Sequence, residues 1–243
     1  MKKQKDKTKL GALFYPTSDT SGKLIPFETL CIPHIYKEVY FEGVYRDVLK
    51  GKKDMIIVDV GANIGIVTQY MRPYAKKIYA IEPSGEHFEA LSKNKTFNGW
   101  DNVELFKIAL SDRNGEMDLV HNAHNRTMNS LAVDTGKNPV SGNLIGKMGK
   151  HGYYQMEKVK TMDMETFFTK NKIKIVDFMK FDVEGAEEMI LRSNGFRKVS
   201  DRIKNIEIEF HFPDWEKLVA HMQGLGFTAR RYDSSVIVVL FTR

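Results

Sequence analysis

The sequence is poor in cysteine and in long apolar runs, and each absence excludes a class of structure. Its 243 residues include one cysteine, Cys31, so no disulfide can form within the chain. This favours a reducing compartment such as the cytoplasm, and Cys31, between Leu30 and Ile32, is interpreted as a buried, inert thiol. No apolar run approaches the roughly 20 residues that a membrane span needs, so no transmembrane segment is expected.

Positive charge is in excess, but much of it lies in one place. The chain carries a formal net charge of +6, and residues 1–9 hold five lysines against one aspartate. No apolar stretch follows them, as a signal peptide would require, so we expect a disordered basic tail. The tail could attract an anionic partner such as nucleic acid, lipid headgroups or a phosphorylated glycan. Residues 10–53 are predicted to form an N-terminal extension that includes a helix over 36–50.

From residue 54 onward, strand and helix patterns alternate. Apolar runs typical of buried strands occupy 55–60, 77–82, 103–110, 175–182 and 204–210. Helical spacing separates them, with Ser84 as a predicted N-cap and Asp214 opening a later helix. The segments 227–232 and 236–242 predict a terminal hairpin. We therefore expect a three-layer α/β sandwich over 54–243, with a mostly parallel sheet and one antiparallel strand.

The stretch 113–160 interrupts this alternation and is interpreted as an insertion. It contains two further predicted strands, at 116–120 and 157–161, around a polar segment with many asparagines. Long loops in compact domains are often functional, so His121, His124, Asn125 and Arg126 are candidate substrate contacts, with a solvated loop as the alternative. The alternation resumes with a predicted helix over 186–194 that ends at Gly195.

The first motif with chemical meaning is VDVGANIG at 58–65, between a buried strand and a helix. Gly61 and Gly65 allow a sharp bend and a close approach of the backbone to a ligand. A pyrophosphate-binding turn would need glycine at 63 and a small residue at 66, but these positions hold Asn63 and Ile66. The pattern disfavours a nicotinamide dinucleotide and favours an amino-acid carboxylate joined to a nucleoside. The alternative is a turn that only connects strand to helix.

Two more motifs follow the next two predicted strands. Glu82 in IEPS (81–84) can accept hydrogen bonds from both hydroxyls of a ribose at the carboxyl edge of the sheet. Asp112 in IALSD (108–112) can bind the exocyclic amine of adenine, although Ser-Asp-Arg-Asn-Gly is equally typical of a turn. A glutamate at a strand end can also be merely solvated.

The fourth motif is KFDVEGAE at 180–187. Lys180, Asp182 and Glu184 alternate along a strand that is otherwise apolar, and buried charge is costly unless it is paired. Such a cluster indicates a functional site, although Lys180 could simply pair with a carboxylate. His211 follows the fifth predicted strand and is a candidate base, with a structural histidine as the alternative.

In combination, these motifs and VKTMDMETFF at 159–168 resemble the FkbM family of S-adenosylmethionine-dependent methyltransferases. The resemblance covers roughly residues 42–210. It implies a class I methyltransferase fold with a seven-stranded Rossmann-like sheet, and O-methylation, commonly of sugar hydroxyls in glycans or natural products. A sugar or glycan acceptor is therefore the expected partner, and the 113–160 insertion departs from the compact family pattern.

The resemblance also implies which residues form the site. The cofactor-binding set comprises Glu42, Asp59, Gly61, Ala62, Asn63, Gly65, Glu82, Pro83, Ser84, Ala109, Ser111, Asp112 and Asp182. The catalytic candidates are Asp182, Glu184, His211 and Lys180, which would align an acceptor oxygen and accept its proton. Asp182 and Glu184 could bind Mg²⁺ with a third ligand from a loop, but no dense ligand cluster in the sequence requires a metal. The alternatives are an RNA cap or ribose methyltransferase and a non-catalytic cofactor-binding homologue.

Overall fold

The computed structural model describes residues 33–122, 130–131, 154–232 and 236–243. The predicted basic tail and the first part of the predicted extension lie outside these residues, as do His124, Asn125 and Arg126. Within the described residues, no helix has the length and apolar character required to cross a bilayer.

A seven-stranded sheet forms the centre of the fold, with the strand order β10-β11-β9-β8-β1-β2-β3. Its strands are β1 (Met55–Val60), β2 (Ala75–Ile81), β3 (Val103–Phe106), β8 (Phe178–Phe181), β9 (Asn205–Phe210), β10 (Thr228–Arg231) and β11 (Ile237–Thr242). Strands β3, β2, β1, β8 and β9 are parallel, whereas β11 runs antiparallel to both β9 and β10. The prediction of a mostly parallel sheet with one antiparallel strand is confirmed.

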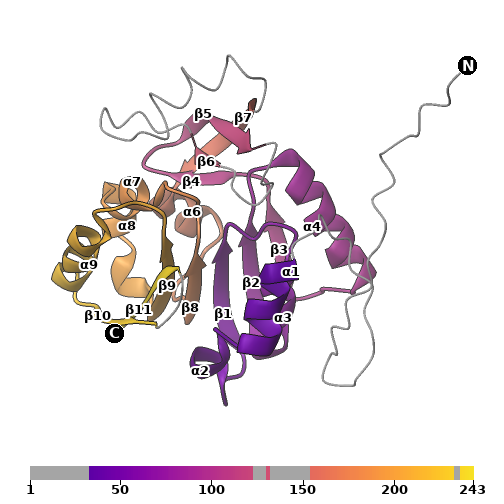
Figure 1. The fold of residues 1–243 in the computed structure, drawn as a ribbon, viewed down its shortest axis with the longest axis horizontal. Helices are drawn as coiled ribbons and strands as arrows, with labels where there is room; N and C mark the ends of the chain where they lie inside the picture. The colour runs from indigo at the N-terminus through magenta and orange to yellow at the C-terminus, as the bar shows by residue number, and fades with distance from the viewer. Residues whose placement is uncertain (1–32, 123–129, 132–153, 233–235) are drawn as a thin grey trace, which may run out of the picture.

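Helices cover both faces of this sheet and give three layers (Figure 1). One face carries α1 (Pro33–Tyr36), the π-helical segment η1 (Lys37–Glu42), α2 (Arg46–Leu49), α3 (Ile66–Met71) and α4 (Gly85–Phe97). The other carries α6 (Met164–Lys170), α7 (Glu187–Leu191), α8 (Asn194–Arg197) and α9 (Trp215–Gly224). Two 3₁₀ turns, η2 (Arg72–Tyr74) and η3 (Ser200–Arg202), precede β2 and β9. Along β1, Ile57 packs with the helices of the first face and Val58 with those of the second, because successive side chains of a strand point to opposite faces of the sheet.

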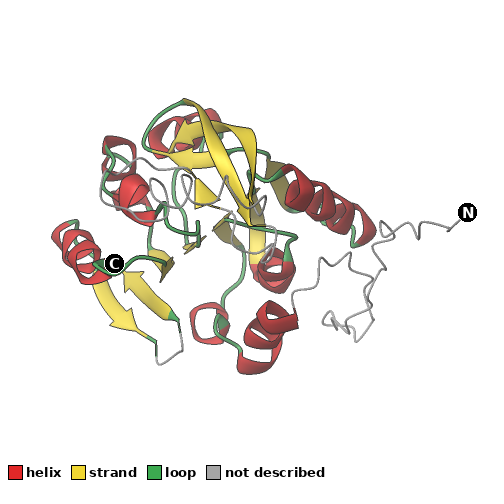
Figure 2. Ribbon diagram, turned by 45° about the horizontal axis from the view of Figure 1, so that its top comes forward, coloured by secondary structure: helices red, strands yellow, loops and turns green. Residues whose placement is uncertain are grey.

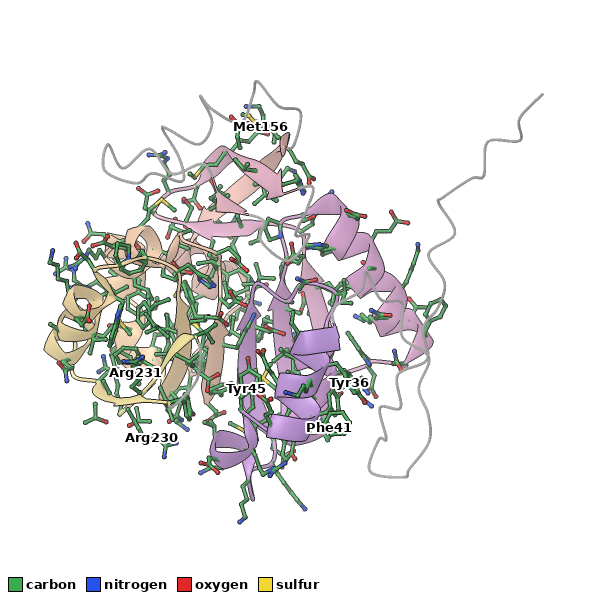
Figure 3. The ribbon with its side chains drawn as sticks, viewed as in Figure 1. Tyr36, Phe41, Tyr45, Met156, Arg230 and Arg231 are labelled. Atoms are coloured by element: carbon green, nitrogen blue, oxygen red, sulfur yellow. The ribbon has the colours of Figure 1, made fainter. Side chains whose placement is uncertain are left out.

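The part of the N-terminal extension that the structure describes packs on the first face through aromatic side chains. The rings of Tyr36 and Tyr40 stack with centroids 4.7 Å apart, and Tyr40 meets Tyr70 of α3 edge to face. Tyr45, labelled in Figure 3, meets the ring of Phe178 of β8 edge to face, with ring centroids 6.2 Å apart. The single helix predicted over 36–50 is wrong, because Gly43 adopts a left-handed conformation and divides it.

A second, four-stranded sheet lies beside the carboxyl ends of the central strands (Figure 2). Its order is β4-β7-β5-β6, formed by β4 (Ala109–Ser111), β5 (Gly115–Asn122), β6 (Ser130–Leu131) and β7 (Tyr154–Asp163). The two strands predicted in the insertion correspond to β5 and β7. The single strand predicted over 103–110 is wrong, because β3 ends at Phe106 and β4 pairs with β7 in the second sheet.

The prediction that Gly195 ends a helix is also wrong. Helix α7 ends at Leu191, and the hydroxyl of Ser193 caps a separate short helix, α8, which contains Gly195. A Cβ at Gly195 would lie 2.9 Å from a carboxylate oxygen of Asp163, so this glycine allows α8 to approach the start of α6 closely.

Candidate active site

The glycine turn after β1 is fixed between its two neighbouring strands. The backbone N–H groups of Gly61 and Ala62 both donate to the carbonyl of Ile81 at the end of β2. On the other side, a Cβ at Gly61 would lie 1.8 Å from the carbonyl oxygen of Asp182. Gly61 also has φ of 78°, so both its conformation and its surroundings require glycine. The turn therefore sets the distance between the ends of β2 and β8.

Gly65 has a different role from Gly61. It has φ of 93°, and a Cβ there would lie 2.7 Å from side-chain atoms of both Leu91 and Trp100. Gly65 is therefore needed for the start of α3 to pack against α4 and Trp100, rather than to leave room for a ligand. Asn63 lies between these glycines and has a left-handed backbone conformation, with φ of 52°. It also lines the cavity beside Glu82.

Glu82 follows β2 and is held in position by backbone groups. Its Oε2 accepts from the N–H of Asn63 at 2.9 Å, and its Oε1 accepts from the N–H of Ser84 at 2.8 Å. The side chain is buried, and burial raises the pKa of Glu82 to about 7 even though both hydrogen bonds favour the charged form. Each carboxylate oxygen retains a second lone pair for a ligand.

We call the space beside this carboxylate the Glu82 cavity. It measures about 60 Å³ and is bounded by Gly61, Asn63, Glu82, Pro83, His87, Ala109, Leu119, Leu131, Asp182 and Glu184, among others. Leu119 and Leu131 come from β5 and β6, so the second sheet covers this cavity. A polar carboxylate among apolar walls suits the hydroxyls of a ribose, but about 60 Å³ is less than a whole nucleoside occupies, so the second sheet would move outward to admit one.

A larger space, the His211 cleft, opens on the other side of the glycine turn. Its volume is about 310 Å³, and its walls include Glu38, Tyr45, Gly61, Asn63, Lys180, Asp182, Glu184, Glu209 and His211. Gly61, Asn63, Asp182 and Glu184 line both spaces. The Glu82 cavity and the His211 cleft therefore meet at these four residues.

Beneath the His211 cleft, a row of charged side chains crosses three central strands. Asp59 of β1 is in register with Lys180 of β8, which is in register with Glu207 of β9. The Lys180 ammonium donates to the carbonyl of Gly61 at 2.8 Å and to Asp182 Oδ2 at 3.0 Å, and it lies 3.9 Å from Asp59. Burial alone would lower the pKa of Lys180, but the charges of Asp182 and Asp59 raise it above its usual value. Lys180 therefore remains a cation that fixes the loop after β8.

His211, directly after β9, is surrounded by carboxylates. Its Nδ1 lies 2.8 Å from Oε1 of Glu187, a fully buried residue at the start of α7. Its Nε2 lies 3.4 Å from Glu209, 3.6 Å from Glu184 and 3.9 Å from Asp182. We call Asp182, Glu184, Glu187, Glu209 and His211 the His211 cluster. Its side chains come from the β8–α7 connection, from α7, and from β9 and the residue after it.

The protonation of the cluster follows from its crowding. Burial, followed by the charge of Asp182, raises the pKa of Glu184 to about 8. Burial alone would lower the pKa of His211, but the hydrogen bonds to Glu187 and Glu209 raise it to about 11. At neutral pH the imidazole is therefore an imidazolium, which cannot accept a proton. This disfavours His211 as the general base, and the raised pKa of Glu184 leaves that carboxyl group mostly protonated at neutral pH, so Asp182 is the remaining candidate.

Several residues predicted for the cofactor site do not line the Glu82 cavity. Asp59 is fully buried under the turn, where its Oδ2 accepts from the Thr68 hydroxyl at 2.5 Å. Ser84 is the buried N-cap of α4. Ala62 lines the His211 cleft, not the Glu82 cavity, and Glu42 lines a neighbouring space.

Of the residues predicted to contact adenine, some line the Glu82 cavity and others do not. Ala109 lines the Glu82 cavity, whereas Ser111 is buried and donates to Met117 Sδ. Asp112 is exposed and accepts from the Ser111 hydroxyl, as the turn interpretation implied. His121, one of the insertion candidates, lies 3.0 Å from Glu157 within the second sheet.

Sequence reasoning missed two acidic members of the His211 cluster, Glu187 and Glu209, and the neighbouring Glu207. A signal was present for two of them, because Glu207 and Glu209 alternate with Ile206 and Ile208 in a central strand. Charged residues on one side of such a strand rarely serve packing alone. Nothing in the pattern around Glu187 distinguished it from an ordinary acidic residue in the first turn of a helix.

Comparison with known proteins decides the family. The model of the FkbM methyltransferase domain matches residues 59–229. The chain belongs to the FkbM methyltransferase family. It is 30% identical to methyltransferase sdnD of Sordaria araneosa over 216 residues, which span 81% of this chain and 82% of that protein. It is 28% identical to methyltransferase 1 of Beauveria bassiana over 182 residues, or 72% of each.

Solved structures agree in fold. A methyltransferase FkbM from Methylobacillus flagellatus aligns with a TM-score of 0.54 at 15% identity, covering 86% of this chain and 48% of that one. An rRNA methylase from Streptococcus thermophilus aligns with a TM-score of 0.51 at 15% identity, covering 83% and 95%. Such identities support a shared methyltransferase fold and nothing about the acceptor. The family and fold implied by the sequence motifs are thus confirmed.

Proposed function

We propose that this FkbM-family methyltransferase uses S-adenosylmethionine to methylate a hydroxyl oxygen, on a sugar of a glycan or glycosylated small molecule. The observation that carries the proposal is the junction of the two spaces. Gly61, Asn63, Asp182 and Glu184 line both the Glu82 cavity and the His211 cleft. A nucleoside at Glu82 and an acceptor near His211 would therefore meet beside Asp182.

The residues of the Glu82 cavity fit the cofactor. The Glu82 carboxylate has one free lone pair on each oxygen, which matches the two adjacent hydroxyls of a ribose. Apolar side chains from the second sheet enclose the same space and suit an adenine ring. When bound there, the cofactor would supply a methyl group on positively charged sulfur, already activated for transfer to the acceptor oxygen.

The chain's own task is to hold the acceptor and take its proton. Asp182 Oδ1 is buried and lacks a hydrogen-bond partner within the described residues, so it is available to an acceptor hydroxyl. Lys180 fixes the other oxygen of the same carboxylate and thereby its direction. We assign Asp182 to positioning the hydroxyl and accepting its proton, with Glu184 beside it at the same junction.

The charge of the cleft bears on the class of acceptor. Glu38, Asp182, Glu184 and Glu209 line it, and Glu42 and Glu207 line the adjoining space. Lys180 and the protonated His211 also line the cleft, but carboxyl groups outnumber these two cations. An acidic excess of this kind opposes a polyphosphate backbone, which proteins usually bind through lysine and arginine. Carboxylates instead accept readily from neutral polyols. The cleft thus favours a sugar acceptor over RNA, while an anionic partner for the basic tail stays a separate proposal.

The test uses cofactor carrying an isotopically labelled methyl group. The protein is incubated with an extract of its host, with a panel of neutral glycosides, and with structured RNA, and the products are analysed by mass spectrometry. We expect label as an O-methyl ether on a sugar. Label on RNA would overturn the acceptor class. Absence of label from every pool, with a protein that binds S-adenosylhomocysteine by calorimetry, would favour a non-catalytic homologue.

A further inference from the structure

We propose that the His211 cluster binds one divalent cation of the Mn²⁺ type through Asp182, Glu184 and His211. The inference rests on the proposed function, because the ion would lie where the acceptor hydroxyl is expected. Each of the three residues offers a ligand atom, and these atoms lie within 4.8 Å of one another. An imidazolium cannot bind a metal, so the ion would displace the proton from Nε2 of His211 as it binds. Two ligands at about 2.1 Å from one ion stand about 3 to 4 Å apart, so a small contraction would suffice.

The orientation of the imidazole is a second, independent observation. Metal-binding histidines usually donate their other ring N–H to a carboxylate, which fixes the ring and its tautomer. Here Glu187, fully buried, holds Nδ1 of His211 at 2.8 Å. The Glu187 carboxylate is itself fixed by the backbone N–H of Gly185. Nε2 is thereby directed at three carboxylates, those of Glu209, Glu184 and Asp182, which lie 3.4, 3.6 and 3.9 Å away.

The charge balance also calls for a cation. Asp182, Glu184 and Glu209 all lie within 4 Å of Nε2, and Glu187 lies behind the ring. Lys180 already donates to Asp182 Oδ2 and to the Gly61 carbonyl. The other carboxylate oxygen, Asp182 Oδ1, is buried without a hydrogen-bond partner in the described residues. Crowded carboxylates of this kind are stabilised by a shared ion.

The ligand set selects the class of ion and its use. Two carboxylates and one imidazole suit Mn²⁺ better than Ca²⁺, which prefers oxygen ligands alone. Three protein ligands leave about three positions of an octahedral ion for water or for acceptor hydroxyls. The bound hydroxyl would become more acidic and would be held beside Asp182, which complements the role assigned to that residue.

The test titrates chelator-treated protein with MnCl₂ and follows free Mn²⁺ by electron paramagnetic resonance. We expect one ion per chain, with affinity at least tenfold lower in Asp182→Asn, Glu184→Gln and His211→Ala. Glu187→Gln, which contacts the His211 ring and the Gly185 N–H but none of the ligand atoms proposed for the ion, should weaken binding by about tenfold. The matched control is Glu188→Gln on the same helix, an exposed residue paired with Arg192, which should bind Mn²⁺ like the parent. Spin-echo modulation from an imidazole nitrogen should be present in the parent and absent from His211→Ala.

Each variant is also titrated with S-adenosylhomocysteine, so that the two proposals fail separately. A protein that binds this nucleoside but no Mn²⁺ would overturn the metal site and leave the proposed function standing. Mn²⁺ binding without nucleoside binding would contradict the proposed function and support the metal site. Equal Mn²⁺ affinity in the parent and in the three ligand variants would place the ion elsewhere and overturn the inference. Competition by MgCl₂ at lower concentration than MnCl₂ would overturn the choice of ion.

Discussion

The Glu82 cavity and the His211 cleft are the two ends of the site, and they hold their carboxylates in opposite ways. Glu82 lies among backbone N–H groups, mostly apolar walls and the His87 ring, whose Nδ1 is 3.8 Å away, and each of its oxygens has one fixed donor. Asp182 and Glu184 instead face other charges. Both lie within 4 Å of the His211 imidazole, and Glu209 lies within 4 Å of the same ring. A neutral diol satisfies the first arrangement, whereas the second requires a cation or a proton. The difference separates recognition of the nucleoside from handling of charge.

The largest effect is expected from a change at Gly61, in the glycine turn where the Glu82 cavity and the His211 cleft meet. In Gly61→Ala, the new Cβ would lie 1.8 Å from the Asp182 carbonyl, at a residue with φ of 78°. Backbone strain and overlap together should lower the free energy of unfolding by about 4 kcal/mol. The control is Gly99→Ala, where φ is 57° but no atom lies within 4 Å, so only about 1 kcal/mol should be lost. Urea denaturation measures both, and equal losses would show that the close approach does not matter.

The second prediction tests the charged end alone. Asp182→Asn keeps the shape of the side chain and an oxygen for Lys180, but it cannot accept the acceptor's proton. Turnover of labelled methyl groups should fall by about 100-fold or more, while affinity for S-adenosylhomocysteine stays within tenfold of the parent. Full activity in this variant would remove Asp182 from the proposed chemistry.

The difference between the two ends also explains what could be predicted from the sequence. Glu82 was recognised because it follows a strand directly, and the carboxyl ends of parallel strands share one edge. The His211 cluster could be predicted only in part, because Glu187 enters it through the packing of α7 against the residue after β9. The division of 103–110 into β3 and β4 was likewise invisible, since it depends on pairing with β7, about 50 residues later in the chain. Local pattern predicts strands and their ends, whereas contacts between distant segments require the folded chain.

The third prediction tests the nucleoside end alone. Glu82→Ala removes the acceptor for both ribose hydroxyls, and two hydrogen bonds with a net value of about 1 kcal/mol each amount to about 2 kcal/mol. Affinity for S-adenosylhomocysteine, measured by calorimetry, should fall by about 30-fold. Glu89→Gln on the exposed side of α4, where the glutamate pairs with Lys93, is the control and should change nothing. Unchanged affinity in Glu82→Ala would contradict the ribose assignment.

The pH dependence of binding sharpens the same point. Because burial raises the pKa of Glu82 from its ordinary 4.5 to about 7, the folded protein holds a proton there that the unfolded chain has lost. Glu82 therefore contributes a loss of stability as pH rises from 4.5 to 7. Ribose hydroxyls favour the charged form, so nucleoside affinity should rise by up to about tenfold between pH 6 and 8. Glu184 and Glu207 have pKa values raised to about 8 and titrate nearby, so the rise is compared with that of Glu82→Gln, which lacks the Glu82 contribution. Identical pH profiles would assign the effect to those other groups.

The smallest expected effect concerns Glu42, which the family resemblance assigned to the cofactor. The structure pairs its carboxylate with Lys37 at 2.7 Å and leaves 48% of the side chain exposed, at the wall of a space shared with Glu207 and Tyr232. Exposed ion pairs contribute about 0–1 kcal/mol, and Glu42 does not line the Glu82 cavity. Glu42→Ala should therefore change nucleoside affinity by less than about twofold, with Lys37→Ala as the matched control for loss of the pair. A tenfold loss in Glu42→Ala but not in Lys37→Ala would mean that η1 moves toward the nucleoside when it binds. The separation of a neutral and a charged end would then hold only for the protein without its cofactor.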